Sequence, residues 1–270
     1  MTLVAVTKTV PVERIRAAVA AGFTVLGENR VQEAAAKITA LRAEGGAVHA
    51  SPEELVAGAV NSSPEAVSVG ASDPGRGGSA PSIGASGPER DESGPNVVEP
   101  GAEAARHGPG RPVTWHLIGP LQSNKARRAV ELFDVIETVD SLALGARLDR
   151  LAAEHARADL PVLLEVNVDA DPGKSGYAPD AITADLPALA NLPRLRLLGL
   201  MTVGRLVAEP EEARPTFRRL RELSERLRAT EPRLGAALSM GMSDDFEVAV
   251  EEGATIVRLG RAIFGARPPA

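Results

Sequence analysis

The sequence LVAVTK, at residues 3–8, decides the fold of this chain. It is short, apolar and rich in β-branched residues, and Pro11 and a helical pattern follow it, so it predicts a buried β-strand. Lys8 stands at the carboxyl end of that strand, where α/β barrels build their binding sites. The chain has four lysines against 26 arginines, and a lysine can form a Schiff base whereas an arginine cannot. Lys8 is therefore a candidate reactive amine, and the alternative is an ordinary strand-end lysine that reaches solvent.

The alternation of apolar runs and helical patterns continues outward from this strand. Strand-like runs occupy residues 3–8, 24–27, 113–118, 134–138, 162–168, 196–201, 236–239 and 255–259. Helical patterns occupy residues 12–21, 30–43, 123–132, 141–157, 179–190, 209–229, 244–252 and 261–265. Strands that alternate with helices form right-handed βαβ units around a parallel sheet. Because eight such strands close a barrel, we predict an α/β protein with a single (β/α)8 TIM barrel rather than a doubly wound sheet.

Residues 45–110 differ in composition from the rest of the chain. These 66 residues hold 13 Gly, 8 Pro and 9 Ser and no aromatic residue. Such a stretch cannot bury enough apolar surface to offset the entropy lost on ordering, so it predicts a long disordered insert between the second helix and the third strand. The predicted organisation is a barrel formed by residues 1–44 and 111–270, interrupted by this acidic insert. A connection from a helix to the next strand opens on the amino-terminal face of a barrel, so we expect the insert to leave the site undisturbed.

The composition excludes several classes of protein and site. The absence of cysteine excludes disulfides, thiolate catalysis and Cys-ligated metals, and the four histidines lack metal-ligand spacing, so we predict no metal site. The insert has nine acidic residues and three arginines, which leaves 27 acidic and 27 basic residues elsewhere (36 − 9 and 30 − 3). This balance, without basic stripes, argues against a nucleic-acid surface. No apolar run is long enough for a membrane span, so we expect a cytoplasmic protein without membrane association. We also expect a monomer.

The loops after the seventh and eighth strands predict an anion-binding corner. The first supplies Ser243, which we expect at the N-cap of a helix over residues 244–252. The second supplies Gly260 and Arg261 at the start of a short helix. Helix N-terminal amides bind anions, and TIM barrels bind phosphate groups at this corner. The alternative is that Ser243 only caps its helix.

A lysine amine that faces a phosphate-binding corner suits a phosphorylated aldehyde, and pyridoxal 5′-phosphate (PLP) is the obvious candidate. Lys8 would form the aldimine with the cofactor. Arg258, at the end of the eighth strand, could face the pyridine nitrogen, where its charge would disfavour protonation of the ring. The alternative for Arg258 is an ion pair at the end of the barrel.

Seven segments of the chain resemble one protein family. They are AVTKTVP (5–11), GENRVQE (27–33), WHLIGPLQSNK (115–125), KSG (174–176), GLM (199–201), SMGMSDDFEVAV (239–250) and VRLGRAIFGAR (257–267). In this order they resemble the pyridoxal phosphate homeostasis protein family (YggS/PROSC-like). The resemblance covers essentially all 204 residues outside the insert (270 − 66). It implies a single barrel related to the N-terminal barrel of alanine racemases, which holds PLP as a lysine aldimine without established turnover and serves intracellular PLP homeostasis.

The resemblance also assigns roles to individual residues. Lys8 is the aldimine residue, and Asn29 lies near the ring hydroxyl of the cofactor. Ser243 and Gly260 bind the phosphate group, and Arg258 contacts the pyridine nitrogen. The resemblance also implies PLP-dependent apo-enzymes as partners that would receive the cofactor.

Two features depart from the family pattern. The family usually has Ser or Thr where this chain has Arg261, which could give the phosphate a charge-assisted contact in place of a neutral hydrogen bond. The family also usually carries a helical segment before the first strand, whereas this chain begins at Met1, almost directly before it. We interpret this as a start assigned too far downstream.

Three other functions fit parts of the sequence. A PLP-dependent racemase or decarboxylase would need a second acid/base group, and the single tyrosine, Tyr177, lies in a loop after the fifth strand. A Schiff-base aldolase would need carboxylates beside its lysine, and none adjoins Lys8 in the sequence. A pure interaction module would act through the acidic insert.

Overall fold

The structure is a computed structural model that describes residues 1–42, 113–205 and 207–266. The insert predicted at residues 45–110 lies outside the described residues. So do the last four residues of the chain, and Leu206. The predicted domain boundaries at 44 and 111 therefore stay predictions.

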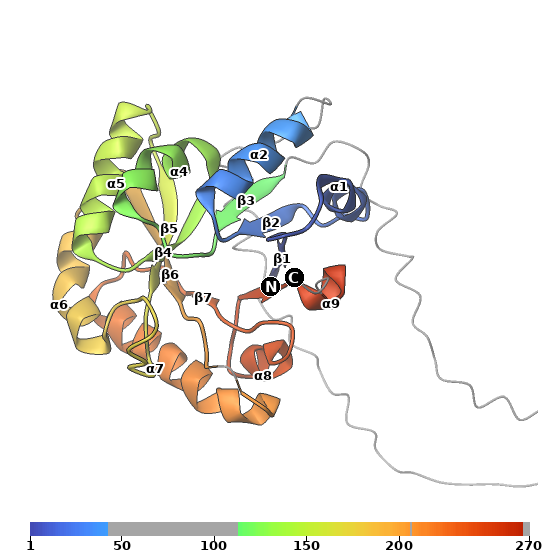
Figure 1. Cartoon of the computed structure of the whole chain (residues 1–270). Helices are drawn as coiled ribbons and strands as arrows, with labels where there is room; N and C mark the ends of the chain where they lie inside the picture. Colours follow the sequence, from blue (N-terminus) through green and yellow to red (C-terminus); the bar gives the residue numbers. More distant parts are fainter. Residues whose placement is uncertain (43–112, 206, 267–270) are drawn as a thin grey trace, which may run out of the picture.

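Eight parallel strands close into a barrel in the order of the sequence, with β8 pairing back onto β1 (Figure 1). The strands are β1 (Thr2–Val6), β2 (Val25–Glu28), β3 (Thr114–Leu117), β4 (Val135–Val139), β5 (Leu160–Glu165), β6 (Leu195–Met201), β7 (Ala237–Ser239) and β8 (Ile256–Leu259). Each lies within two residues of a run predicted from apolar patterning, except at the carboxyl end of β5. The predicted (β/α)8 barrel is confirmed.

Helices follow the strands and cover the outside of the barrel. They are α1 (Val12–Ala20), α2 (Val31–Arg42), α4 (Ala126–Leu132), α5 (Leu142–Glu154), α6 (Pro179–Ala190), α7 (Arg214–Thr230), α8 (Phe246–Glu251) and α9 (Arg261–Phe264), with short 3-10 turns η2 (Ser123–Lys125) and η3 (Pro210–Ala213). In α7, Phe217, Leu220, Leu223 and Leu227 recur every three or four residues, and all are buried. This spacing gives the helix one apolar face, which packs on the barrel. No helix in the described ranges is both long and apolar enough to cross a bilayer.

Alternate residues of each strand face the barrel axis. A separate apolar cluster joins Val4, Val135, Leu163, Met201 and Ile256. These side chains come from β1, β4, β5, β6 and β8, so they can meet only inside the barrel. The larger cluster, which includes Ala5, Leu26 and Trp115, fills the space between the strands and the helices. Because Val4 faces inward, Val6 lies on the same side of β1, and Lys8 follows in the turn at the carboxyl-terminal end of the strand.

Candidate functional site at the carboxyl-terminal mouth of the barrel

Lys8 lies in the turn that follows β1, and its side chain is partly buried. It lines a pocket of about 160 Å³ together with Val6 from β1, Arg14 from α1, and Gly260, Arg261 and Phe264 at the start of and along α9. The pocket lies where the segments after β1 and β8 meet, and these two strands are neighbours only because the barrel closes. The structure thus brings Lys8 and the predicted anion-binding corner, about 250 residues apart in the chain, to one site.

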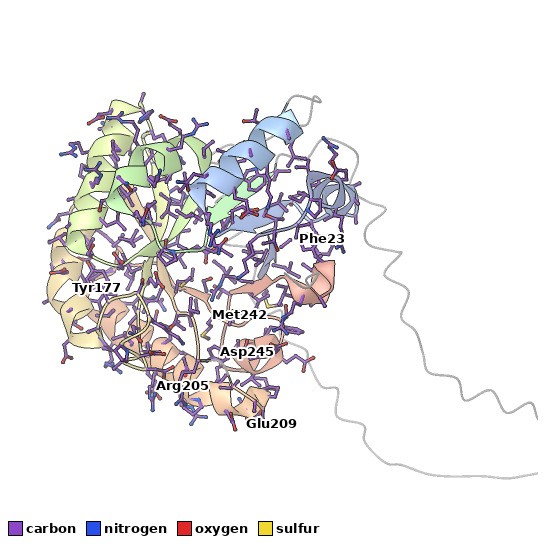
Figure 2. The ribbon with its side chains drawn as sticks, viewed as in Figure 1. Phe23, Tyr177, Arg205, Glu209, Met242 and Asp245 are labelled. Atoms are coloured by element: carbon purple, nitrogen blue, oxygen red, sulfur yellow. The ribbon has the colours of Figure 1, made fainter. Side chains whose placement is uncertain are left out.

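The anion-binding corner is built differently from the expectation. The Ser243 Oγ atom accepts the backbone N–H groups of Gly260 at 3.2 Å and Ala262 at 3.3 Å. The predicted N-cap role of Ser243 is wrong, because α8 begins at Phe246 and its N-cap residue is Asp245. A turn precedes the helix, in which the Asp245 carboxylate accepts the Met242 N–H at 2.6 Å (both labelled in Figure 2). The Ser243 hydroxyl is therefore directed at the start of α9 rather than at its own helix.

Arg261 belongs to the pocket wall, but its guanidinium is exposed and forms an ion pair with Asp244. Both side chains are more than half exposed. The charge of Arg261 is thus shared with a neighbouring acid at the rim of the pocket. The predicted contact of Arg261 with a phosphate group stays a prediction.

Arg258 is buried inside the barrel, below the mouth. Its Nη1 atom donates to Ser239 Oγ at 2.6 Å and its Nη2 atom donates to the Thr202 carbonyl at 2.7 Å. Burial lowers the pKa of Arg258, whereas the nearby Glu137, Glu165 and Asp245 oppose this shift. Two neutral hydrogen-bond partners therefore fix the direction of the guanidinium, and three nearby carboxylates compensate its positive charge. The sequence alone suggests a single ion pair at the end of the barrel as the alternative role.

Two glutamates inside the barrel complete this layer. Glu137 accepts hydrogen bonds from Ser239 Oγ at 2.5 Å and pairs with His116 Nδ1 at 2.5 Å. Although burial alone opposes its ionisation, His116 and Arg258 lower the pKa of Glu137. Glu165 is 4% exposed, and its Oε2 atom has no hydrogen-bond partner among the described residues. Burial raises the pKa of Glu165 to about 7, and the charge of Asp140 adds to the shift.

Asn29 follows β2 and lies against the end of β3. A Cβ atom placed on Gly119 would come within 2.5 Å of the Asn29 carbonyl oxygen, so the two loops touch closely. Asn29 does not line the pocket that contains Lys8. Its predicted contact with the ring hydroxyl of a cofactor stays a prediction, as do the predicted contacts of Ser243 and Arg258.

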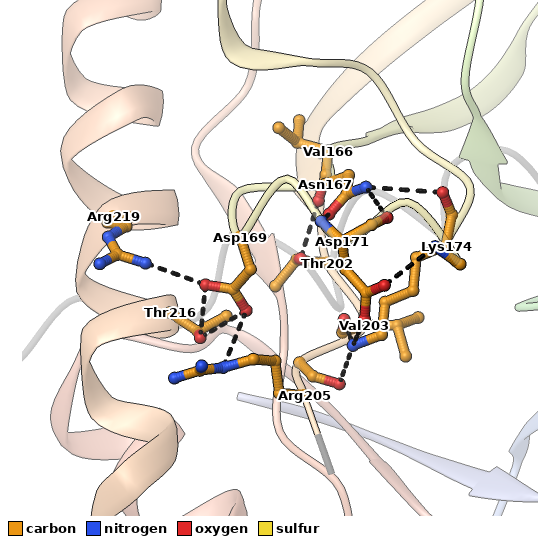
Figure 3. Close-up of polar contacts among 12 residues, drawn as sticks. Val166, Asn167, Asp169, Asp171, Lys174, Thr202, Val203, Arg205, Thr216 and Arg219 are labelled. Atoms are coloured by element: carbon orange, nitrogen blue, oxygen red, sulfur yellow. Dashed lines mark hydrogen bonds and ion pairs between the residues drawn. The ribbon is translucent and has the colours of Figure 1, made fainter.

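A polar network connects the loops that follow β5 and β6 with α7 (Figure 3). Lys174 Nζ donates to the Gly204 carbonyl at 2.8 Å, and Asn167 Nδ2 donates to the Asp171 carbonyl at 2.8 Å. Asp169 accepts the Thr216 hydroxyl at 2.8 Å and pairs with Arg219 at 3.0 Å. These contacts connect the loops after β5 and β6, at the mouth of the barrel, to α7.

Sequence reasoning missed four polar residues on α2 and its neighbours: Thr7, Glu28, Glu33 and Lys37. They form a cluster directly behind the Lys8 turn, in which Glu33 is partly exposed and the other three residues are buried. One signal was present in the sequence, since Lys37 is another of the four lysines in a chain that otherwise uses arginine, and Glu33 precedes it by four residues. That spacing places the two side chains on one face of a helix.

The pocket places Lys8 beside the backbone at the start of α9. Lys8 stands in the turn after β1, and the Gly260 and Ala262 amides both donate to Ser243 Oγ, so they converge on one acceptor position. Amides that converge in this way can bind a phosphate oxygen. A Cβ atom on Gly260 would lie 3.5 Å from Val6 Cβ, which is an ordinary van der Waals contact, so the space beside Gly260 is open.

Comparisons with known proteins identify the family of this chain. The family described as alanine racemase, N-terminal domain, matches residues 1–268. A pyridoxal phosphate homeostasis protein from Pseudomonas aeruginosa is 47% identical over 160 residues, which is 58% of this chain and 66% of that protein. A protein of the same name from Synechocystis sp. is 41% identical over 155 residues, which is 57% of this chain and 71% of that protein.

Solved structures of related proteins are also similar to this chain. PipY from Synechococcus elongatus, determined with PLP bound, is 33% identical with a TM-score of 0.70, over 98% of this chain and 92% of that chain. An alanine racemase from Clostridium difficile shares the fold at 13% identity and a TM-score of 0.59, over 100% of this chain and 52% of that chain. The resemblance read from the sequence motifs is confirmed. The chain belongs to the family of the alanine racemase N-terminal domain and, within it, to the pyridoxal phosphate homeostasis proteins.

Proposed function

We propose that this chain binds PLP in the pocket between β1 and β8 and holds it for intracellular PLP homeostasis. The observation that carries the proposal is the juxtaposition of the Lys8 amine with the backbone amides at the start of α9 in one pocket. In this proposal Lys8 is the covalent anchor, and Ser243 and Gly260 hold the phosphate group. The structure of PipY with PLP bound supports the choice of ligand.

The surroundings of Arg258 support retention of the cofactor over turnover. Bound PLP can act as an electron sink for amino-acid chemistry, and that ability is greatest when its pyridine nitrogen is protonated. Ser239 and Thr202 hold the Arg258 guanidinium in place, and a fixed positive charge near the ring nitrogen disfavours its protonation. We therefore propose that the protein holds the cofactor without turnover.

Tyr177 gives a second argument against a racemase. It is the single tyrosine of the chain and it is 4% exposed, in the apolar cluster between barrel and helices. Burial raises the pKa of its hydroxyl. A buried phenol in the outer layer is poorly placed to exchange protons with a ligand at the mouth of the barrel.

The proposal also covers the location, the oligomeric state and the partners of the protein. We place the protein in the cytoplasm as a monomer that exchanges PLP with PLP-dependent apo-enzymes. Gel filtration with light scattering would test the monomer, since a stable dimer would appear at twice the chain mass of 28.1 kDa.

The central test replaces Lys8. The purified protein is expected to bind PLP with visible absorbance, and borohydride reduction is expected to fix the cofactor mass on Lys8. Lys8→Ala should lose the absorbance of the covalently bound cofactor and the mass addition, because the covalent anchor is removed, while the remaining phosphate-binding groups can still bind PLP non-covalently. Lys125→Ala is the matched control and should keep both signals, since Lys125 lies in η2 outside the pocket wall.

Two outcomes would contradict the proposal. A wild-type protein that stays colourless after reconstitution with PLP would show that PLP is not its ligand. Racemisation or decarboxylation of amino acids by the PLP-bound protein would instead support the racemase or decarboxylase alternative.

A further inference from the structure

Lys37, on α2, is the centre of a buried polar cluster behind the Lys8 turn. It is 7% exposed, and its Nζ atom donates to the Thr7 carbonyl at 2.6 Å, to Glu28 Oε1 at 2.7 Å and to Glu33 Oε1 at 2.6 Å. The contact with the Thr7 carbonyl matters most here, because Thr7 is the residue directly before Lys8. A side chain of α2 thus holds the backbone on the amino side of Lys8.

Glu33 holds the backbone on the other side. Its Oε1 atom accepts the Thr9 N–H at 2.6 Å, and Thr9 is the residue directly after Lys8. Although burial alone opposes ionisation, the hydrogen bonds from Lys37 and from the Thr9 N–H lower the pKa of Glu33. An ionised carboxylate is the stronger acceptor for both donors. We call Lys37, Glu33 and Glu28 the α2 clamp.

The backbone that the clamp holds is strained. Thr9 has φ of 64°, in the left-handed region, and it is β-branched. Such a conformation is unfavourable for a β-branched residue and persists only where its surroundings fix it. The strained turn carries Lys8, which lines the pocket at the carboxyl ends of β1 and β8. Without the clamp, Thr9 would be expected to relax and the Lys8 amine to sample other directions.

Glu28 connects the clamp to β2. It is fully buried, and its Oε1 atom accepts the Thr7 hydroxyl at 2.6 Å as well as the Lys37 Nζ atom. Thr7 is therefore held at both its side chain and its carbonyl. The cluster joins β1, β2 and α2 on the outer face of the barrel, so its members act on Lys8 through the backbone and do not line the pocket themselves.

We propose that Lys37 and Glu33 are positioning residues for Lys8, which fix the direction in which its amine enters the cofactor pocket. This inference rests on the proposed function, since it assigns a device that serves the covalent anchoring of PLP. A positioned amine reacts as if present at a high local concentration. The clamp should therefore strengthen covalent attachment and leave the separate phosphate-binding corner unaffected.

The test separates covalent from non-covalent binding with two ligands. PLP carries the aldehyde that reacts with Lys8, whereas pyridoxine 5′-phosphate carries an alcohol in its place and cannot form the covalent bond. Affinities for both ligands would be measured for the wild-type protein, Glu33→Ala, Glu33→Gln and Lys37→Met. The matched control is Glu131→Ala, which removes an exposed ion pair with Arg128 on α4.

Glu33→Ala is the decisive variant, because Glu33 is partly exposed and its loss leaves no unpaired charge deep in the protein. We expect it to weaken PLP binding by roughly tenfold or more, the effect of one charge-assisted hydrogen bond. Binding of pyridoxine 5′-phosphate should stay within about twofold, as for an ordinary surface substitution. Glu33→Gln should recover much of the loss, since its amide oxygen can still accept the Thr9 N–H. Glu131→Ala should change neither affinity.

Other results would overturn the inference. Equal losses for both ligands in Glu33→Ala would show that the clamp only maintains the local fold, and unchanged affinities would show that it does not position Lys8. In a Lys8→Ala background, a further loss of PLP affinity on adding Glu33→Ala would also contradict it. Lys37→Met could fail to fold because it leaves Glu28 without its ammonium partner, and in that case Glu33→Ala decides. A wild-type protein that binds neither ligand would instead refute the proposed function itself.

Discussion

Glu137 on β4 and Glu165 on β5 face the same barrel interior, yet their surroundings have opposite electrostatic effects. Glu137 has His116 and Ser239 as direct partners, and these lower its pKa together with Arg258. Glu165 Oε2 has no partner within the described ranges, and burial raises its pKa to about 7. A buried carboxylate stabilises the fold only where other groups compensate its lost hydration. Glu137 is therefore expected to stabilise the fold in its ionised form, whereas ionisation of Glu165 is expected to destabilise the fold.

Glu165→Gln should stabilise the protein above neutral pH. The folded-state pKa of about 7 lies above the ordinary value of 4.5, so the folded protein binds more protons than the unfolded chain between these values. Stability contributed by the protonated group is then lost as the pH rises through this window. Because the amide introduced by Glu165→Gln does not ionise, the variant should keep a free energy of unfolding higher than that of the wild type by on the order of 3 kcal/mol at pH 8. Urea unfolding of both proteins at pH 5 and pH 8 would measure this difference.

Glu137→Gln is the matched control and has the opposite expectation. Because the folded state favours the ionised form of Glu137, the substitution should destabilise the protein at pH 8. If both variants were destabilised at pH 8 by similar amounts, the assignment of opposite roles would be wrong.

Among the elements, β6 carries an irregularity that shapes this side of the barrel. Its pairing with β5 shifts register between Val162 and Leu163, and Gly199 follows the extra residue with φ of 150°. A Cβ atom on Gly199 would lie 2.0 Å from the Ala237 carbonyl oxygen of β7. The close approach of β6 to β7 therefore requires glycine at this position.

Gly199→Ala is expected to reduce the free energy of unfolding by more than about 3 kcal/mol, because two backbone strands would have to separate. Gly22→Ala serves as the comparison. Gly22 also has a positive φ, of 98°, but a Cβ atom there would meet no described atom within 4 Å. Its loss should be about 1 kcal/mol, from backbone strain alone. Equal losses in the two variants would show that β6 and β7 separate at little cost.

The prediction of elements from the sequence was accurate where apolar periodicity was strong. The strands and most helices agree with the predicted ranges within a few residues. The exception with consequences is α8, which was expected from residue 244 and begins at Phe246. A side-chain contact across 17 residues, from Ser243 to the Gly260 amide, competes there with local capping. Local sequence rules do not include such a contact.

At the scale of the whole molecule, barrel closure creates the candidate site. Register pairs between β1 and β8, such as Val4 with Arg258, place the first and last strands of the barrel side by side. Arg14 on α1 adds a contact by donating to the Phe264 carbonyl of α9 at 2.6 Å. The pocket with Lys8 therefore depends on the correct closure of all eight strands.

Deletion of residues 45–110 should leave both folding and PLP binding intact. The deletion would join α2 to β3 on the amino-terminal face, opposite the mouth, through a connection of ordinary length. Thermal unfolding and the visible absorbance of bound PLP would be compared between the full chain and the deleted form. A marked loss of either would show that the insert contributes to the barrel.

The sequence by itself determined the eight-strand alternation, the position of Lys8 at a strand end and the family, because these depend on local periodicity and contiguous motifs. The tertiary structure alone decided which distant groups meet: Ser243 with the start of α9, Arg258 with Ser239, and Lys37 with the backbone beside Lys8. These contacts join segments that lie between 17 and 30 residues apart in the chain. Their formation depends on strand register and barrel closure, which fix side-chain directions that no local pattern encodes.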